Sequence, residues 1–198
     1  MNSTGDLLDL PLREFLDVVA AEEPTPGGGS AAALAVAVSA GLSAMVARAS
    51  PDWPEAGSAV AQAERLRKRA APLAQRDAEA YEEALVTLRL PERVEPEVRD
   101  AAVGAALGRT AEVLLAIGEA GADAAWLAAL VADRGTPERR GDAVAAAQLA
   151  DAGARAAAAL IAVNLTVRPG DERSVHAQEL AATAGDAARE ALRSIDAA

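Results

Sequence analysis

The chain has 198 residues, of which 52% are hydrophobic but only 2% aromatic, and its formal net charge is −11. The acidic balance argues against nucleic acid as a partner, because such binding depends on basic residues that neutralise phosphates. The absence of cysteine excludes disulfides, thiol nucleophiles and zinc–thiolate sites, and a single histidine predicts no metal site of the common His-rich kind.

The pattern of apolar residues predicts an all-α protein: a bundle of five to six helices, several of them long, in one domain spanning residues 1–198. No stretch is typical of a strand. Pro72 is expected to kink the third helical segment or to begin a new turn there. In chain order, the expected helical segments are Leu10–Ala21, Ser30–Ala49, Glu55–Leu88, Glu97–Ala132, a segment after Pro137 that runs to about Val167, and Ser174–Ile195.

Alanine supplies much of the apolar content, so each buried side chain removes little area from water. A core of such small side chains is hard to complete within one subunit, which favours a two-fold dimer. The apolar run Ala31–Val46 is short for a membrane span, and the N-terminal residues Met1–Asp6 lack the basic and apolar regions of a signal peptide. We therefore expect a cytoplasmic homodimer without membrane contact.

The segment Glu23–Ser30 contains two prolines and three consecutive glycines and precedes the most apolar of the predicted helices. The glycines permit backbone angles that other residues avoid, and they place no side chain between the backbone and a ligand. With Ser30 as the expected N-cap, the free N–H groups of the helix suit an anion or developing negative charge. The alternative is a tight turn with a helix cap and no ligand.

A carboxylate interrupts an apolar stripe of the third segment. Leu73, Asp77, Tyr81 and Leu85 are spaced by four, with Leu88 close to one turn further on, so Asp77 is expected to face inward with the leucines. In an apolar site the pKa of a carboxyl group rises towards values useful for acid–base catalysis. The alternative is a structural aspartate that bonds to a neighbouring helix or to an arginine.

Two polar residues share one face of the segment that follows Pro137. Asp142 and Asn164 are 22 residues apart, which is roughly 33 Å along an unbroken helix, so one chain cannot bring both to the same atom. Either one of them serves chemistry, or an antiparallel partner brings the second copy alongside. The structural alternatives are an N-cap role for Asp142 and a helix-end role for Asn164.

Several sequence blocks occur here in an order that is found in one protein family. The blocks are Pro24-x-Pro26-Gly27-Gly28-Gly29-Ser30 before an Ala-rich helix ending Met45-Val46, Asp77-x-x-x-Tyr81 before Arg89-Leu90-Pro91, then Arg99, Gly135, Asp142 and finally Asn164-Leu165. From Leu10 to about Arg168, the sequence resembles the cyclodeaminase/cyclohydrolase family. That family includes the cyclodeaminase part of formiminotransferase-cyclodeaminase and stand-alone methenyltetrahydrofolate cyclohydrolases.

The resemblance implies an all-α dimer with a tetrahydrofolate derivative bound as substrate near the glycine loop, and with no metal or redox cofactor. The implied reaction is hydrolysis of 5,10-methenyltetrahydrofolate to 10-formyltetrahydrofolate or cyclodeamination of 5-formiminotetrahydrofolate. The alternative is a catalytically silent dimer of the same fold that binds another small molecule in the same cleft. The implied catalytic residues are Asp77, Asp142 and Tyr81, and the implied substrate-binding residues are Pro26, Gly27, Gly28, Gly29, Ser30 and Asn164.

The sequence also departs from the family pattern. Family members commonly have an asparagine where Leu160 stands and a proline where Leu114 stands. They also carry other polar residues around Thr136, Glu138 and Gly141. Hydrogen-bonding groups are therefore missing from places where the resemblance would put substrate contacts.

Overall fold

The computed structural model describes residues 5–91, 95–165 and 170–196. Within these ranges the regular secondary structure is helical throughout and contains no strand, as the sequence predicts. The elements are η1 (Leu7–Asp9), α1 (Leu12–Val19), α2 (Gly28–Arg48), α3 (Ala56–Ala70), α4 (Leu73–Leu88), α5 (Pro96–Arg134), η2 (Pro137–Arg139), α6 (Arg140–Asn164) and α7 (Glu172–Asp196).

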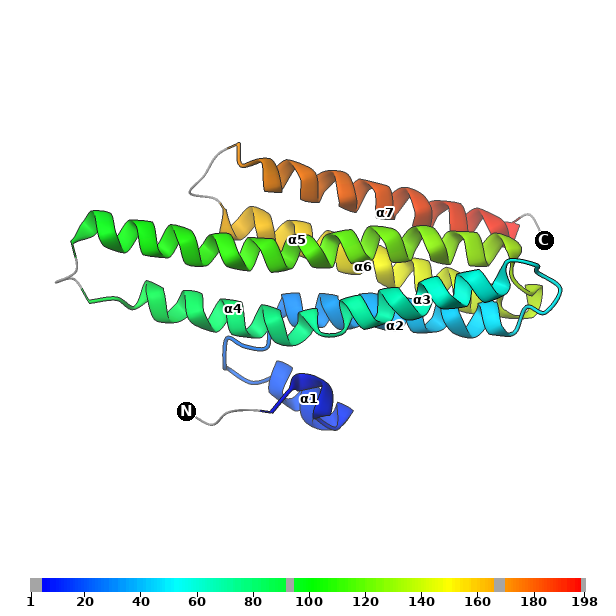
Figure 1. The fold of residues 1–198 in the computed structure, drawn as a ribbon, viewed down its shortest axis with the longest axis horizontal. Coiled ribbons are helices and arrows are strands. Elements are labelled where there is room, and N and C mark those ends of the chain that lie inside the picture. The colour runs from blue at the N-terminus through cyan, green and yellow to red at the C-terminus, as the bar shows by residue number, and fades with distance from the viewer. Residues whose placement is uncertain (1–4, 92–94, 166–169, 197–198) are drawn as a thin grey trace.

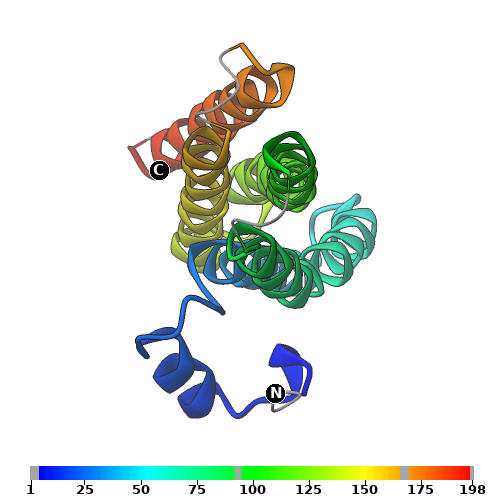
Figure 2. The ribbon, with the colours of Figure 1, turned by 90° about the vertical axis from the view of Figure 1, so that its left-hand side faces the viewer.

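Helices α2 to α7 form an elongated bundle around α5, which runs along nearly its whole length (Figure 1). Helices α3 and α4 follow one another along one side, and α6 and α7 cover another side of α5. Helix α1 lies outside this bundle, as both views show (Figures 1 and 2), and Phe15 is its buried residue. The bundle of six helices confirms the predicted all-α bundle, while the two-fold dimer stays a prediction.

The helix boundaries lie close to those expected from the sequence. Helix α5 spans Pro96–Arg134, against a prediction of Glu97–Ala132. The third predicted segment divides at Pro72, which is the N-cap of α4, because a proline ring removes a helical hydrogen bond and clashes with the preceding turn. The helix predicted to run to about Val167 ends at Asn164, and Val167 itself lies outside the described residues.

Glycines allow the helices of this alanine-rich core to pack very closely. A Cβ atom added at Gly121 of α5 would lie 3.0 Å from Ala154 Cβ and 3.1 Å from the Ala150 carbonyl oxygen, both in α6. A Cβ atom added at Gly153 of α6 would lie 2.6 Å from Val36 Cγ2 in α2. Close backbone approach therefore replaces the large side chains that the sequence lacks.

Three of the described segments are long and apolar enough to cross a membrane, judged by length and composition alone: α2, α5 and Pro137–Asn164. Helix α2 has 21 residues, so it is longer than the run Ala31–Val46 suggested. In the bundle, 61% of the apolar window of α2 and 61% of that of α5 are buried against other helices. The absence of membrane contact remains a prediction.

Candidate functional site

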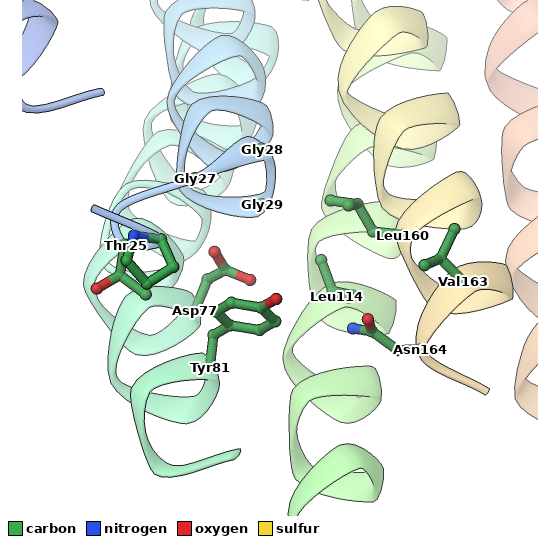
Figure 3. Close-up of a pocket in the computed structure, with 11 residues that line it drawn as sticks. Thr25, Gly27, Gly28, Gly29, Asp77, Tyr81, Leu114, Leu160, Val163 and Asn164 are labelled. Carbon is green, nitrogen blue, oxygen red and sulfur yellow. The ribbon is translucent and has the colours of Figure 1, made fainter. Parts of the chain in front are cut away.

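A cavity of about 210 Å³ lies at the N-terminal end of α2, between that helix and α4, α5 and α6 (Figure 3). The glycine loop, Asp77, Tyr81 and Asn164, which are far apart in the sequence, come together around it. Its lining residues are Pro24, Thr25, Gly27, Gly28, Gly29, Asp77, Tyr81, Leu114, Leu160, Val163 and Asn164.

Asp77 extends from α4 towards the first turn of α2. The residue is only 7% exposed, which confirms the inward orientation that its spacing predicted. A Cβ atom added at Gly29 would lie 2.1 Å from Asp77 Oδ1 and 2.4 Å from its Cγ, so the carboxylate occupies the space that any larger residue at position 29 would need. Gly29 is therefore required by the close approach of Asp77.

Backbone conformation does not explain the three glycines, contrary to expectation. Among the described residues, Gly170 is the one with positive φ, while Gly27 has φ −124° and ψ −149°. Gly27 is also the N-cap of α2, which begins at Gly28, two residues earlier than predicted. Ser30 is consequently in the first turn rather than at the N-cap.

Ser30 holds the Asp77 carboxyl group in place. Its side chain is fully buried, and the hydroxyl oxygen lies 3.1 Å from Asp77 Oδ2 and 2.8 Å from the Ala74 carbonyl oxygen, both in α4. The residue is absent from the cavity lining. Asp77 is thus bonded to a neighbouring helix, as the structural alternative anticipated, but its partner in the described structure is a serine and not an arginine.

Burial raises the pKa of Asp77 above its ordinary value, because the cavity and the packed helices remove water from the charged form. Hydrogen bonds from the Ser30 hydroxyl and its backbone N–H act in the opposite direction and favour the carboxylate. The Asp77 carboxyl group lies at the start of α2, where the glycine loop predicted an anion-binding site. Binding of a ligand there stays a prediction.

The rest of the lining combines the polar side chains of Thr25, Tyr81 and Asn164 with an apolar wall. The Tyr81 hydroxyl and the Asn164 amide point into the space between α4 and α6 (Figure 3). The wall across from Asp77 consists of Leu114, Leu160 and Val163. Asp77 and Tyr81 are the titratable side chains of the lining, so no cation from the described residues neutralises Asp77 there.

The sequence analysis did not name Pro24, Thr25 or Val163 as site residues, and it named Leu114 and Leu160 only as departures from the family pattern near expected substrate contacts. Pro24 and Thr25 adjoin the glycines, and Leu160 lies one turn before Asn164, so both signals were available in the sequence. For Leu114 the departure from the family pattern was the only signal, because helical spacing within α5 does not show how α5 lies against α4 and α6.

Three residues proposed for the site are not among the lining residues: Pro26, which is buried, Ser30, which contacts the lining residue Asp77, and Asp142. Asp142 is the third residue of α6, with Arg139 as the N-cap, so the N-cap reading of Asp142 is wrong. Roughly 33 Å of continuous helix separates it from Asn164 in the same chain. A catalytic role for Asp142 stays a prediction.

Across the described residues, no group of three or more His, Cys, Asp or Glu side chains is arranged to hold a metal ion.

The fold and the cavity define an all-helical protein with a buried carboxyl group beside a small, largely apolar binding site. The formiminotransferase-cyclodeaminase family model matches residues 11–184, and the chain belongs to this family. It is 32% identical over 162 residues to a methenyltetrahydrofolate cyclohydrolase of Methylorubrum extorquens, covering 77% of this chain and 78% of that protein.

Its fold is similar to the crystal structure of formiminotetrahydrofolate cyclodeaminase from Thermotoga maritima. The TM-score is 0.84, with 24% sequence identity over 96% of this chain and 98% of that one. The family resemblance seen in the sequence is therefore confirmed, and it extends to the architecture of nearly the whole chain.

Proposed function

We propose that this protein hydrolyses 5,10-methenyltetrahydrofolate to 10-formyltetrahydrofolate, with Asp77 as the group that transfers protons. The buried Asp77 carboxyl on the wall of the cavity is the observation that carries this proposal. The similarity to a methenyltetrahydrofolate cyclohydrolase supports the choice of substrate. The residue roles rest on geometry and on the chemistry of the reaction.

The substrate carbon lies between N5 and N10 in an amidinium cation and is electrophilic. A carboxylate beside it stabilises the cation, and the bound cation in turn favours ionisation of Asp77, which burial alone disfavours. A cavity of about 210 Å³ is smaller than a pocket for a complete drug-sized molecule. We therefore place only the reactive ring system in the cavity, with the tail of the folate extending past the exposed Val163.

The reaction requires one water and balanced proton transfers. Asp77 accepts a proton from the water as its oxygen bonds to the bridging carbon. Asp77 then donates that proton to N5 as the bond between carbon and N5 breaks. The hydroxyl proton leaves to solvent as the formyl C=O forms on N10, so one proton is released overall. Tyr81 and Asn164 orient the ring through hydrogen bonds.

Cyclodeamination of 5-formiminotetrahydrofolate would use the same groups, and the family description makes it the second candidate. In that reaction N10 attacks the formimino carbon and its proton passes to the formimino nitrogen. Asp77 donates one further proton to that nitrogen, and ammonia leaves as the bond between carbon and nitrogen breaks. A protein that only binds a small molecule in this cavity would catalyse neither reaction.

The test follows the near-ultraviolet absorbance of 5,10-methenyltetrahydrofolate at a pH where its spontaneous hydrolysis is slow. Wild-type protein should remove the band, and Asp77→Asn should lower turnover by on the order of 10²–10⁴. Glu79→Gln is the matched control, because Glu79 is an exposed carboxylate of the same helix. Absence of turnover with this substrate, combined with band formation from 5-formiminotetrahydrofolate, would replace the hydrolase by the cyclodeaminase. No turnover of either would favour a binding protein.

The proposal includes a two-fold homodimer formed through one face of α2. Ala31, Leu34, Val38, Leu42 and Met45 follow helical spacing and are exposed or half-buried, and Val38 is 54% exposed. No charged residue occurs from Gly28 to Ala47. A long uncharged stripe of this kind is typical of an interface. Light scattering at micromolar concentration should give a dimer, and Val38→Asp should dissociate it; a monomeric wild type would refute this part.

A further inference from the structure

Ser30 has one hydroxyl proton and two oxygen neighbours. Its oxygen lies 2.8 Å from the Ala74 carbonyl oxygen and 3.1 Å from Asp77 Oδ2, and the side chain is fully buried. A hydroxyl group can donate one hydrogen bond at a time, and it can accept through its lone pairs. The Ser30 proton can therefore serve only one of the two contacts, and the other contact needs a proton from Asp77 or carries no hydrogen bond.

The protonation state of Asp77 decides which position is favoured. An ionised carboxylate only accepts, so the Ser30 hydroxyl then donates to Asp77. The Ala74 carbonyl does not need that bond, because it lies within α4 and accepts from the helix backbone. When Asp77 is protonated, its own O–H donates to the Ser30 oxygen, and the Ser30 hydroxyl turns to the Ala74 carbonyl.

We propose that Ser30 is a positioning residue that serves both protonation states of Asp77 by turning its hydroxyl between the carboxylate and the Ala74 carbonyl. Asp77 keeps a hydrogen bond to the Ser30 side chain throughout proton uptake and release, in addition to the one from the Ser30 backbone N–H, so its carboxyl group stays at the cavity wall. The use of these two states in turnover rests on the proposed hydrolase function. The hydrogen-bond exchange itself does not.

Among the described residues that line the cavity, no other charged side chain stabilises the ionised form of Asp77 as Ser30 does. Tyr81 of α4 is the other titratable side chain of the lining, and α2, α5 and α6 contribute glycine, aliphatic and amide groups to it. The hydrogen bonds from Ser30 are the influences that lower the pKa of Asp77 against the effect of burial. Removal of the hydroxyl therefore leaves the charged form with less stabilisation.

The experiment compares Ser30→Ala with Ser43→Ala, a matched control. Ser43 is fully buried in the same helix, donates to the Ser39 carbonyl oxygen at 3.1 Å and does not line the cavity. In Ser30→Ala, the acidic limb of the kcat–pH profile should move to higher pH, and kcat at neutral pH should fall on the order of tenfold or more. Ser43→Ala should leave the profile in place.

A second readout does not require turnover: the carbon-13 titration of the Asp77 carboxyl in the full chain, assigned by its loss in Asp77→Asn. Its pKa should rise in Ser30→Ala, and an unchanged pKa would overturn the role of Ser30 even if the enzyme is active. A raised pKa in a protein without turnover would support this role while refuting the hydrolase. If Ser30→Ala does not fold, Ser30→Cys, with its weaker donor, should shift the pKa in the same direction by less, and no shift would overturn the proposal.

Discussion

Replacing Gly29 by alanine should abolish most activity without unfolding the protein. The added Cβ atom would lie 2.1 Å from Asp77 Oδ1, whereas ordinary van der Waals contact begins at 3.4 Å. The carboxylate must therefore move from 2.1 Å to at least 3.4 Å, a displacement of about 1.3 Å. A misplacement of about 1 Å at a reacting group costs on the order of 10²-fold in rate, so kcat should fall by at least that factor.

Stability should respond differently, because the obstructing atoms belong to the end of a side chain that can rotate. Alanine in a helix is favoured over glycine by up to about 1 kcal/mol. For a chain of this length, that gain corresponds to about 2–4 °C in Tm. Moving the carboxylate also breaks its hydrogen bond to Ser30, which costs about 0.5–1.5 kcal/mol and offsets this gain. Calorimetry should therefore give a Tm for Gly29→Ala close to that of the wild type, alongside the loss of methenyltetrahydrofolate hydrolysis.

Gly41→Ala is the control in the same helix. Its added Cβ would meet Arg67 Cδ at 3.9 Å, which is an ordinary contact, and Gly41 does not line the cavity, so kcat should stay within a few-fold of the wild type. The double variant Gly29→Ala/Asp77→Asn should be no slower than Asp77→Asn alone, because both changes act through the same carboxylate. Wild-type kcat in Gly29→Ala, or an unfolded protein, would refute the reasoning.

Three further outcomes are expected. Burial raises the folded-state pKa of Asp77, so the stability of the wild type falls as pH rises through that pKa. Asp77→Asn should therefore match or exceed the wild-type Tm at pH 7, and the difference should vanish near pH 4. A lower Tm of the variant at pH 7 would contradict this. Gly121→Ala should lower the free energy of unfolding by about 1–3 kcal/mol through overpacking against α6, whereas Gly118→Ala, with 3.6 Å to Leu180 Cδ1, should be neutral or stabilising in the same denaturant titration. Asp142→Asn should leave kcat unchanged if each site is formed by residues of a single chain. A large loss of kcat would indicate that a second subunit brings its Asp142 to the cavity.

Much of the fold follows from helical periodicity. The spacing of Asp77 with Leu73 placed both on a buried face of α4, and the structure confirms this. The same stripe also included Leu88, which is 53% exposed, because the C-terminal end of α4 extends past the start of α2 (Figure 1). Periodicity within one helix indicates on which face a residue lies, but it does not show where along that face the neighbouring helix begins or ends.

The site was harder to predict for the same reason. The glycine loop indicated an anion, and the position of Asp77 indicated a buried carboxyl group, but their contact depends on how α2 lies against α4. Leu114 joined the cavity through the packing of α5, which no local pattern records. Sequence reasoning thus found both partners, Gly29 and Asp77, without finding that they meet.

Because Gly29 and Asp77 are in contact, the residue allowed at each position depends on the residue at the other, although the two are 48 residues apart in the chain. Gly29 does not have positive φ, so nothing in its backbone forbids a larger residue once the carboxylate is gone. A side chain at position 29 and an acidic residue at position 77 are incompatible in this geometry. In related proteins that have lost the reaction, the two positions are therefore free to change together. A glycine kept at position 29 then indicates that the carboxylate at position 77 is still used.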